Sequence, residues 1–316
     1  MAQKMDMECR ICGSYAARKV TAREMMLGLR ESFDYAECED CGCLQICEVP
    51  EDLGRYYDAG YYSIGRANPL VLAAKEARLK YITTGRGMLG RLVCIAYPRD
   101  KDARIAPNGV TKNSRLLEVG CGNGYYLLRL LELGYTRLWG VDPFMDSRSI
   151  RDKPLRLERR TLLDIDPGEG PVDTILFYHS FEHIPQQHES LERARQLLAP
   201  GGVCLIAIPT VSSWAWDHYG TDWVQLDAPR HLYLHSRRSL SQLAERHGFV
   251  VDEVSDNSNA FQFWGSELYR ADIPLRSDAA KRAERQGKDN PDYMSRAEQL
   301  NREGRGDQFV ACLRKA

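Results

Sequence analysis

Residues 116 to 124 read LLEVGCGNG, and this stretch is the most informative about the fold. The residues LLEV predict a short strand, and three closely spaced glycines, Gly120, Gly122 and Gly124, predict a tight turn directly after it. The apolar pattern that begins at Tyr125 predicts a helix. A turn of bare backbone at the start of a helix lets a ligand lie against the peptide groups. The stretch therefore predicts a strand, a ligand-binding turn and a helix, in that order.

Apolar strand patterns and amphipathic helix patterns continue to alternate after this turn. The segments are GYYLLRLLELG, RLWGVD, LRLERRTL, VDTILFYH, SLERARQLLAP and GGVCLIAIP. Such alternation is typical of an α/β fold, in which helices cover both faces of a parallel sheet. In these sheets ligands bind outside the carboxyl ends of the strands, so we expect the functional residues at the strand ends.

Two kinds of cofactor use a glycine turn of this geometry. The dinucleotide fingerprint GxGxxG needs a small residue three positions after Gly122, where this chain has Tyr125, so the pattern argues against a dinucleotide. Asp142 ends the second strand, where a carboxylate can accept hydrogen bonds from both hydroxyls of a ribose. These residues indicate a nucleoside cofactor without naming it.

The cysteines near the amino terminus form a repeated pattern. CxxCG occurs at residues 9–13 and again at residues 38–42, and each copy can place two thiolates on one side of a tight turn. We predict a closed, structural zinc site and weigh it against redox and disulfide alternatives. Cys43 and Cys47 are expected to pack as small apolar groups. The predicted zinc ligands are Cys9, Cys12, Cys38 and Cys41.

The bulk properties are those of an ordinary globular protein. The chain has 316 residues, 43% hydrophobic content and a formal net charge of -1. No apolar run approaches the roughly 18 residues that span a bilayer, and the first ten residues lack the apolar core of a signal peptide, so we expect a cytoplasmic protein. The charge-rich stretch from 272 to 307 alternates in sign and is expected to form a solvated helix. Because no basic face is apparent, we expect no nucleic-acid partner.

The stretch HSFEH, from His179 to His183, has the residue order of one class of zinc peptidases. In those enzymes both histidines lie on one helix face. Here the apolar run VDTILFY predicts a strand that ends at His179, and Pro185 places the next helix start later. The sequence therefore argues against a peptidase.

Several motifs together resemble a known family. LLEVGCGNG, GVDP, LFYHSFEHIP and LLAPGGVCLIAIP resemble the cofactor-site motifs of class I S-adenosylmethionine-dependent methyltransferases. The paired CxxCG, RYYDAGYYS, DAPRHLYLHSRRSLSQLAERHGF and GRGDQFVACLRK resemble the branch that carries an amino-terminal zinc ribbon, with many enzymes of polysaccharide and nucleotide-sugar pathways. Only residues 272 to 300 lack a counterpart. The resemblance implies a Rossmann-like, seven-stranded, mostly parallel sheet with helices on both faces, plus a small zinc-ribbon domain.

The resemblance also implies domain boundaries and cofactor contacts. We expect a zinc ribbon at 1–48, a helical lid and linker at 49–111, and the methyltransferase domain at 112–316. The methionine part of the cofactor would lie at the glycine turn, the ribose at the carboxylate after the second strand, and adenine after the third strand, with two tyrosines as a lid. The implied S-adenosylmethionine contacts are Tyr57, Tyr61, Glu118, Gly120, Gly122, Gly124, Asp142, Leu162, Leu163, Asp164 and His179.

The segment from Val211 to Ser236 is the expected acceptor site. It holds three of the five tryptophans, and aromatic faces suit a sugar ring, although some of them are expected simply to pack the loop. The resemblance aligns His231 with an acceptor-side histidine of sugar C-methyltransferases, but Arg230 replaces their glutamate, which favours oxygen methylation. We predict His231 as the general base, with His179 as the alternative, and Arg230 as a group that steers a substrate anion.

These inferences predict an S-adenosylmethionine-dependent methyltransferase that methylates a hydroxyl of a sugar or sugar-containing metabolite in polysaccharide biosynthesis. The alternatives are C-methylation of a nucleotide-linked keto sugar, methylation of a quinone-like small molecule, and a methyltransferase that binds RNA. The expected partner is a small-molecule or glycan acceptor, with no nucleic acid and no transmembrane segment. The sequence does not define the oligomeric state.

Overall fold

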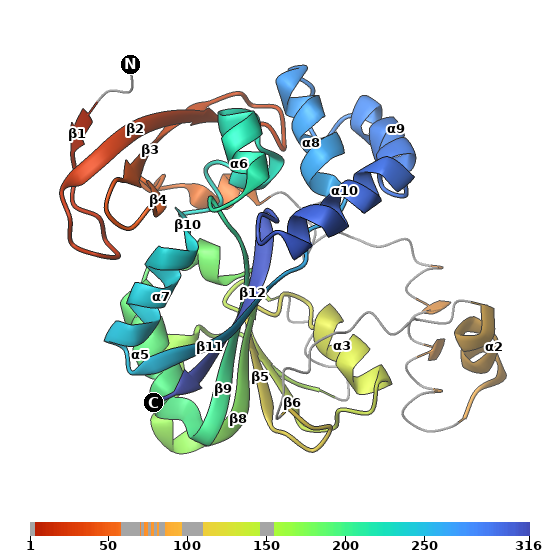
Figure 1. Cartoon of the computed structure of the whole chain (residues 1–316). Coiled ribbons are helices and arrows are strands. Elements are labelled where there is room, and N and C mark those ends of the chain that lie inside the picture. Colours follow the sequence, from red (N-terminus) through yellow and green to blue (C-terminus); the bar gives the residue numbers. More distant parts are fainter. Residues whose placement is uncertain are drawn as a thin grey trace. The chain divides into compact units, whose positions relative to one another are not determined.

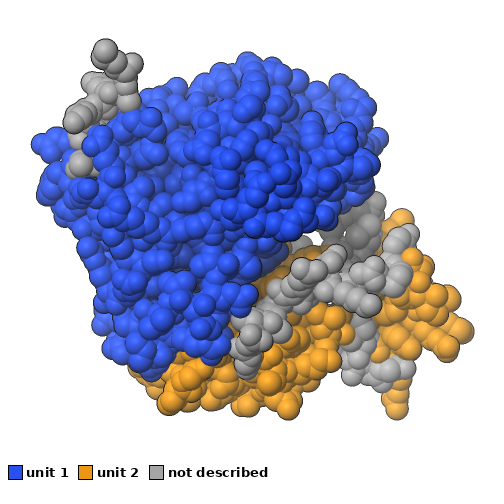
Figure 2. All heavy atoms as spheres, viewed as in Figure 1, with its two compact units in different colours: residues 1–56, 177–196, 203–316 blue, residues 57–176, 197–202 orange. Residues whose placement is uncertain are grey.

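The chain divides into two compact units, shown in Figure 2. The computed structural model describes residues 4–57, 70, 73–74, 77–78, 81, 86–96, 110–145 and 155–316. Unit 1 comprises Met1–Tyr56, Phe177–Gln196 and Val203–Ala316, and unit 2 comprises Tyr57–Leu176 and Leu197–Gly202. The glycine turn and Asp142 belong to unit 2, whereas the cysteine pairs and the acceptor segment belong to unit 1.

A seven-stranded sheet has the order β11-β12-β9-β8-β5-β6-β7 (Figure 1). Its strands are β5 (Leu116–Val119), β6 (Leu138–Val141), β7 (Arg156–Glu158), β8 (Val172–Tyr178), β9 (Leu198–Pro209), β11 (Phe249–Asp256) and β12 (Gln308–Lys315). β5, β6 and β7 pair in parallel, whereas β12 pairs antiparallel with both β9 and β11. The predicted Rossmann-like, mostly parallel fold is confirmed.

In unit 2, the first strand, turn and helix follow the predicted order. Every residue of β5 is buried, and so is every residue of β6, as expected for strands covered on both faces. The helix after the turn is α3 (Tyr125–Glu132). Unit 2 also contains α2 (Met88–Ala96) and the short 3₁₀ helices η2 (Leu162–Asp164) and η3 (Pro167–Glu169).

A second sheet, in unit 1, has the order β1-β2-β3-β4-β10. Four of its strands lie near the amino terminus, β1 (Lys4–Asp6), β2 (Ala16–Arg23), β3 (Ser32–Cys38) and β4 (Leu44–Ile46). The fifth, β10 (Tyr233–Leu234), comes from the acceptor segment and pairs antiparallel with β4. The cysteine-bearing segment therefore shares a sheet with the acceptor segment, and the domain boundary at residue 48 stays a prediction.

The helices of unit 1 include two in the charge-rich region. They are η1 (Leu53–Tyr56), η4 (Phe181–His183), α5 (Gln187–Leu197), which ends at the unit boundary, α6 (Trp214–Tyr219), η5 (Gly220–Asp222), η6 (Val224–Leu226), α7 (Arg237–Arg246), α8 (Phe261–Arg270), α9 (Asp278–Gly287) and α10 (Pro291–Arg302). Ser277 caps α9, because its side chain accepts a hydrogen bond from Ala280 N. Ala280 and Leu300 are buried against residues of α8, so this region packs as two helices instead of one. Among the described helices, none is long and apolar enough to cross a membrane.

Candidate functional site

The glycine turn of unit 2 has the backbone conformation that only glycine adopts easily. Gly120, Gly122 and Gly124 have φ values of 73°, 52° and 68°. Gly120 N donates to Val141 O at 2.8 Å, which ties the turn to the end of β6. A Cβ at Gly124 would lie 3.0 Å from Leu157 Cδ1, so the turn also packs tightly on β7.

Asp142 follows β6 and holds the turn in place. Its Oδ2 accepts a hydrogen bond from Gly122 N at 2.9 Å, and its Oδ1 accepts one from Phe144 N at 2.8 Å. Each carboxylate oxygen can accept more than one hydrogen bond, so these backbone bonds are compatible with a role toward ribose hydroxyls. Asp142 therefore has the chemistry expected of the ribose-binding residue.

Glu118 lies in β5 directly before the turn and is buried. Its Oε2 has no hydrogen-bond partner. Burial, and then the nearby charge of Asp142, raise the pKa of Glu118 well above its usual range. A cationic ligand would stabilise the ionised form of this carboxylate. The turn thus fits S-adenosylmethionine, which carries an ammonium and a sulfonium, and it opposes the pyrophosphate of a dinucleotide.

The other predicted cofactor contacts are only partly described. Leu162 is buried in η2, Leu163 is half-buried, and the exposed Asp164 accepts hydrogen bonds from Thr161 N and Oγ1 at 2.8 and 2.7 Å. Tyr57 stacks on Phe144 with ring centroids 6.2 Å apart. Tyr61 lies outside the described residues. The roles of these residues at adenine and in a lid stay predictions.

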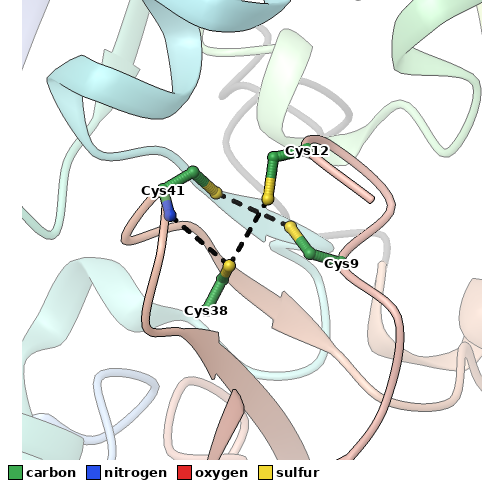
Figure 3. Close-up of side chains that lie close together, drawn as sticks. All are labelled: Cys9, Cys12, Cys38 and Cys41. Carbon is green, nitrogen blue, oxygen red and sulfur yellow. Dashed lines mark hydrogen bonds between the residues drawn. The ribbon is translucent and has the colours of Figure 1, made fainter. Parts of the chain in front are cut away.

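The four predicted zinc ligands converge in unit 1, as Figure 3 shows. Cys9 Sγ lies 3.6 Å from Cys41 Sγ, and Cys12 Sγ lies 3.5 Å from Cys38 Sγ. All four are free thiols. Zinc–sulfur bonds of about 2.3 Å in a tetrahedron separate the sulfurs by about 3.8 Å, so small shifts would complete the site. The donor set fits a structural zinc ion.

The two cysteine turns have matching backbones. Gly13 N donates to Cys9 O and Gly42 N donates to Cys38 O, both at 2.8 Å. The two glycines have φ values of 81° and 73°. The repeated CxxCG therefore folds as two equivalent turns, which is the arrangement that the sequence predicts. Cys43 is fully buried, as expected of a packing residue.

A second cluster of unit 1 surrounds Glu182, which is 1% exposed. Glu182 Oε1 lies 3.7 Å from His179 Nδ1 and 4.0 Å from His231 Nε2, and neither carboxylate oxygen has a hydrogen-bond partner. Burial raises the pKa of Glu182, but the nearby imidazoles, chiefly that of His179, outweigh it and hold the pKa below its usual value. The cluster joins η4 to the acceptor segment.

Backbone carbonyls orient two imidazoles of this Glu182 cluster. His183 Nδ1 lies 2.8 Å from Arg230 O, and His231 Nδ1 lies 2.8 Å from Gln225 O. The two imidazole rings are 4.7 Å apart. Burial, and then His183, lower the pKa of His231 to about 4, so His231 is neutral at pH 7.

His179 differs from His231 in exposure and in backbone. Its side chain is 32% exposed, compared with 10% for His231. Its φ of 50° is rare outside glycine, and strained residues of this kind concentrate at functional sites. The backbone is fixed by a bond from His179 N to Ala207 O at 2.9 Å. Of the two predicted catalytic histidines, His179 is the more accessible.

Arg230 is fully buried and ion-paired, so the prediction that it steers a substrate anion is wrong. Its guanidinium contacts Asp227 at 2.6 and 3.0 Å and Glu24 at 3.1 Å. A buried arginine needs such partners, because an unpaired charge in the interior is costly. No sequence pattern indicates this network, since Glu24 and Arg230 lie 206 residues apart.

Most aromatic residues of the acceptor segment pack inside the protein. Trp223 is fully buried and donates from Nε1 to Asp307 at 3.1 Å, and Tyr219, Tyr233 and His235 are buried as well. His218 is exposed, and Trp214 and Trp216 are half-buried. The packing role expected for some of these residues applies to most of them.

The sheet, the glycine turn and the two carboxylates define a class I S-adenosylmethionine-dependent methyltransferase. A family model described as a methyltransferase domain matches residues 95–254. This match covers half of the chain, and the chain belongs to that family. The predicted enzyme class is confirmed.

Curated relatives match part of the chain. A tRNA U34 carboxymethyltransferase of Idiomarina loihiensis is 28% identical over 49% of this chain and 51% of its own length. One of Azotobacter vinelandii is 42% identical over 38% of this chain and 40% of its own. The chain spans about half the length of the first of these relatives, or less for the second. A solved mycolic acid cyclopropane synthase covers 74% of this chain and 88% of its own, with 20% identity and a TM-score of 0.44.

These relatives correct one expectation. We expected a small-molecule or glycan acceptor and no nucleic acid, but the curated relatives are named for an activity on tRNA. The physical reason for the error is that net charge averages over the whole chain. Residues 148 to 160 hold six basic and two acidic residues, a local excess that the overall charge of -1 hides.

Proposed function

We propose that the protein transfers a methyl group from S-adenosylmethionine to an oxygen atom of an RNA. The buried carboxylate of Glu118, whose Oε2 has no hydrogen-bond partner, carries the cofactor part of the proposal. The tRNA activity in the names of the curated relatives supports the acceptor class. Residues 148 to 160 add a basic stretch of the kind that binds phosphates.

Each cofactor residue has a distinct task in this proposal. Glu118 offsets the positive charge of the methionine part, Asp142 accepts hydrogen bonds from the ribose, and the glycine turn lets the cofactor approach the backbone. Tyr57 forms part of a lid, and Leu162, Leu163 and Asp164 lie at the adenine. Bound S-adenosylmethionine supplies the methyl group on a sulfonium, which is a good leaving group.

His179 is the general base of the proposed reaction, and His231 is the second candidate. The acceptor oxygen attacks the methyl carbon, the carbon–sulfur bond breaks, and the hydroxyl proton passes to the imidazole of His179. The exposure of His179 and its position 3.7 Å from Glu182 support this assignment, because a carboxylate stabilises the imidazolium that forms. S-adenosylhomocysteine leaves as the demethylated product.

The test is methyl transfer from labelled S-adenosylmethionine to total tRNA, compared with nucleotide sugars. We expect label in the RNA, a rate that falls steeply with salt, and a loss of at least about a hundredfold in His179→Ala. His247→Ala, which changes a half-buried histidine outside the acceptor segment, is the control. Label in a nucleotide sugar and none in RNA would overturn the RNA acceptor and support sugar O-methylation instead.

The basic stretch offers a separate arm of the test. Arg159 is exposed, and its Nε donates to Pro143 O at 3.1 Å. Arg159→Glu should weaken RNA binding and reduce its salt dependence while leaving cofactor affinity unchanged. Lys281→Glu, on the exposed face of α9, is a matched charge reversal outside this stretch. Equal loss of RNA binding in both variants would argue against the stretch as the contact.

Three further assignments belong to this proposal. A zinc ion occupies the Cys9, Cys12, Cys38 and Cys41 site, supported by the sulfur positions. The chain belongs to the zinc-ribbon branch of the family, supported by its paired CxxCG motifs. It acts in the cytoplasm, supported by its free thiols, which a reducing compartment maintains.

A further inference from the structure

We propose that Glu182, His183 and His231 form a second metal site, which binds a divalent transition-metal ion. The three residues each offer one ligand atom, and these atoms lie within 4.8 Å of one another. The site is separate from the four-cysteine site and has a different donor set. Two of its ligands, Glu182 and His183, belong to the HSFEH stretch. The third ligand is His231, which lies 48 residues after His183, and His179 is not a ligand.

The tautomers of both histidines favour metal binding. A backbone carbonyl can only accept a hydrogen bond, so Nδ1 of His183 and Nδ1 of His231 must each carry the proton toward Arg230 O and Gln225 O. In a neutral imidazole this leaves the lone pair on Nε2. Metal-ligating histidines in proteins have this arrangement, with the second nitrogen bonded to a carbonyl or carboxylate that fixes the ring.

The environment of the Glu182 carboxylate supports the metal site separately from the histidine tautomers. Its side chain is 1% exposed, and neither Oε1 nor Oε2 has a hydrogen-bond partner. Burying a carboxylate without hydrogen bonds costs several kcal/mol unless a cation or a donor compensates for it. Asp227, the other acid near His231 Nε2, at 3.9 Å, is already paired with Arg230. A bound cation would satisfy the Glu182 carboxylate.

The distance between Glu182 and His231 requires only a modest contraction. Glu182 Oε1 lies 4.0 Å from His231 Nε2, whereas ligands at about 2.1 Å from a tetrahedral metal lie about 3.4 Å apart. Two histidines and one carboxylate are the donors of catalytic zinc sites and of non-haem iron sites. Such three-residue sites leave a coordination position open. The chemical class of the ligand is therefore a zinc-like or iron-like divalent ion.

The open position suggests a role, which rests on the proposed function. An acceptor hydroxyl bound to the cation would lose its proton more readily, because the cation stabilises the alkoxide. A histidine that coordinates through Nε2 has no lone pair left for a proton. The metal site therefore assigns the general base to His179 and removes His231 from that role.

The experiment measures metal stoichiometry in the full-length protein without RNA or S-adenosylmethionine. After loading with ZnCl₂ and dialysis, we expect two zinc ions per chain in the wild type. Glu182→Gln, which preserves side-chain shape, and His231→Gln should each hold one. Cys12→Ser should lose the other, so Glu182→Gln combined with Cys12→Ser should hold none. His218→Ala should keep two.

Cobalt identifies which site is lost. Co²⁺ bound to four thiolates absorbs strongly in the near ultraviolet, whereas Co²⁺ bound to imidazole and carboxylate does not. Glu182→Gln should keep the thiolate band while losing one equivalent of cobalt. Wild-type protein that takes up only one equivalent of Zn²⁺, Mn²⁺ and Fe²⁺ would overturn the proposal, as would full retention in both Glu182→Gln and His231→Gln. Circular dichroism on the same samples shows that each variant is folded, and binding of S-adenosylmethionine, measured by calorimetry, tests the proposed function separately.

Discussion

At the residue scale, Asp142 combines two tasks that a substitution would remove together. Asp142→Ala loses the bond to Gly122 N and the expected bonds to the ribose. Hydrogen bonds to a charged group contribute about 1.5 to 3 kcal/mol each, so S-adenosylmethionine should bind at least tenfold more weakly. Calorimetry measures this directly, and Asp252→Ala, a surface change in unit 1, is the control. Unchanged affinity in Asp142→Ala would contradict the ribose assignment.

The raised pKa of Glu118 predicts that cofactor binding releases a proton. In the free protein burial raises the pKa of Glu118, and a bound cation would lower it again. Binding should therefore strengthen as pH rises toward the pKa of the free protein and level off above it. Calorimetry in buffers of different ionisation enthalpy measures the released protons. Glu118→Gln should release fewer protons, and equal release in both proteins would place the proton elsewhere.

Single residues were predictable from the sequence where their signal is local. Gly120 to Gly124 and the two CxxCG motifs need only a few neighbouring positions to specify a turn, and the structure has those turns. Arg230 was misread, because its partner Glu24 is distant in sequence and only the folded chain brings the two together. The burial of Trp223 was equally hidden, since aromatic residues suit a core and a binding surface alike.

At the scale of elements, the glycine turn joins β5 to α3 under steric constraint. Gly124→Ala should lower the free energy of unfolding more than Gly201→Ala does. Both residues have left-handed φ values, 68° and 74°, which cost about 1 to 2 kcal/mol in a residue with a side chain. Only Gly124 also faces Leu157, at 3.0 Å, whereas nothing lies within 4 Å of Gly201.

Urea denaturation of the two glycine variants isolates the packing contribution, because the backbone cost is common to both. A stability loss of equal size would mean that Leu157 moves aside without cost.

The strand and the helix on either side of the glycine turn were predictable from the periodicity of apolar residues in the sequence. The division of residues 272 to 300 into α9 and α10 did not, because alternating charge describes a solvated face and carries no information about a break.

At the scale of the whole chain, the Glu24–Arg230 pair connects residues that are far apart in sequence. Glu24→Ala should destabilise the protein by about 3 to 5 kcal/mol, because it leaves a fully buried guanidinium with one acidic partner fewer. Asp34→Ala breaks the more exposed pair with Lys19 and should cost less than about 1 kcal/mol. Urea midpoints compare the two, and equal losses would contradict the buried role of Glu24.

Removal of the proposed zinc ion should affect the acceptor segment as well as the cysteine turns. β10 pairs with β4, and Tyr35 of β3 donates from its hydroxyl to His231 O at 2.9 Å. A chelator that releases the ion should therefore reduce hydrogen-exchange protection at Leu44–Ile46 and Tyr233–Leu234. Protection at Leu116–Val119 in unit 2 is the internal reference. Unchanged protection of β10 after chelation would mean that the proposed zinc site does not stabilise the acceptor segment.

The short strand β10 limits how this protein can be recombined with its relatives. It places two residues of the carboxyl-terminal half in the sheet of the amino-terminal segment, with Tyr233 opposite Gln45. A chimera that exchanges only residues 1–48 would thus have to match a foreign β4 to the resident β10. Exchange of the amino-terminal segment together with residues around 230 to 236 preserves the pairing. We therefore expect a chimera to acquire the acceptor preference of a relative only when both stretches are exchanged together.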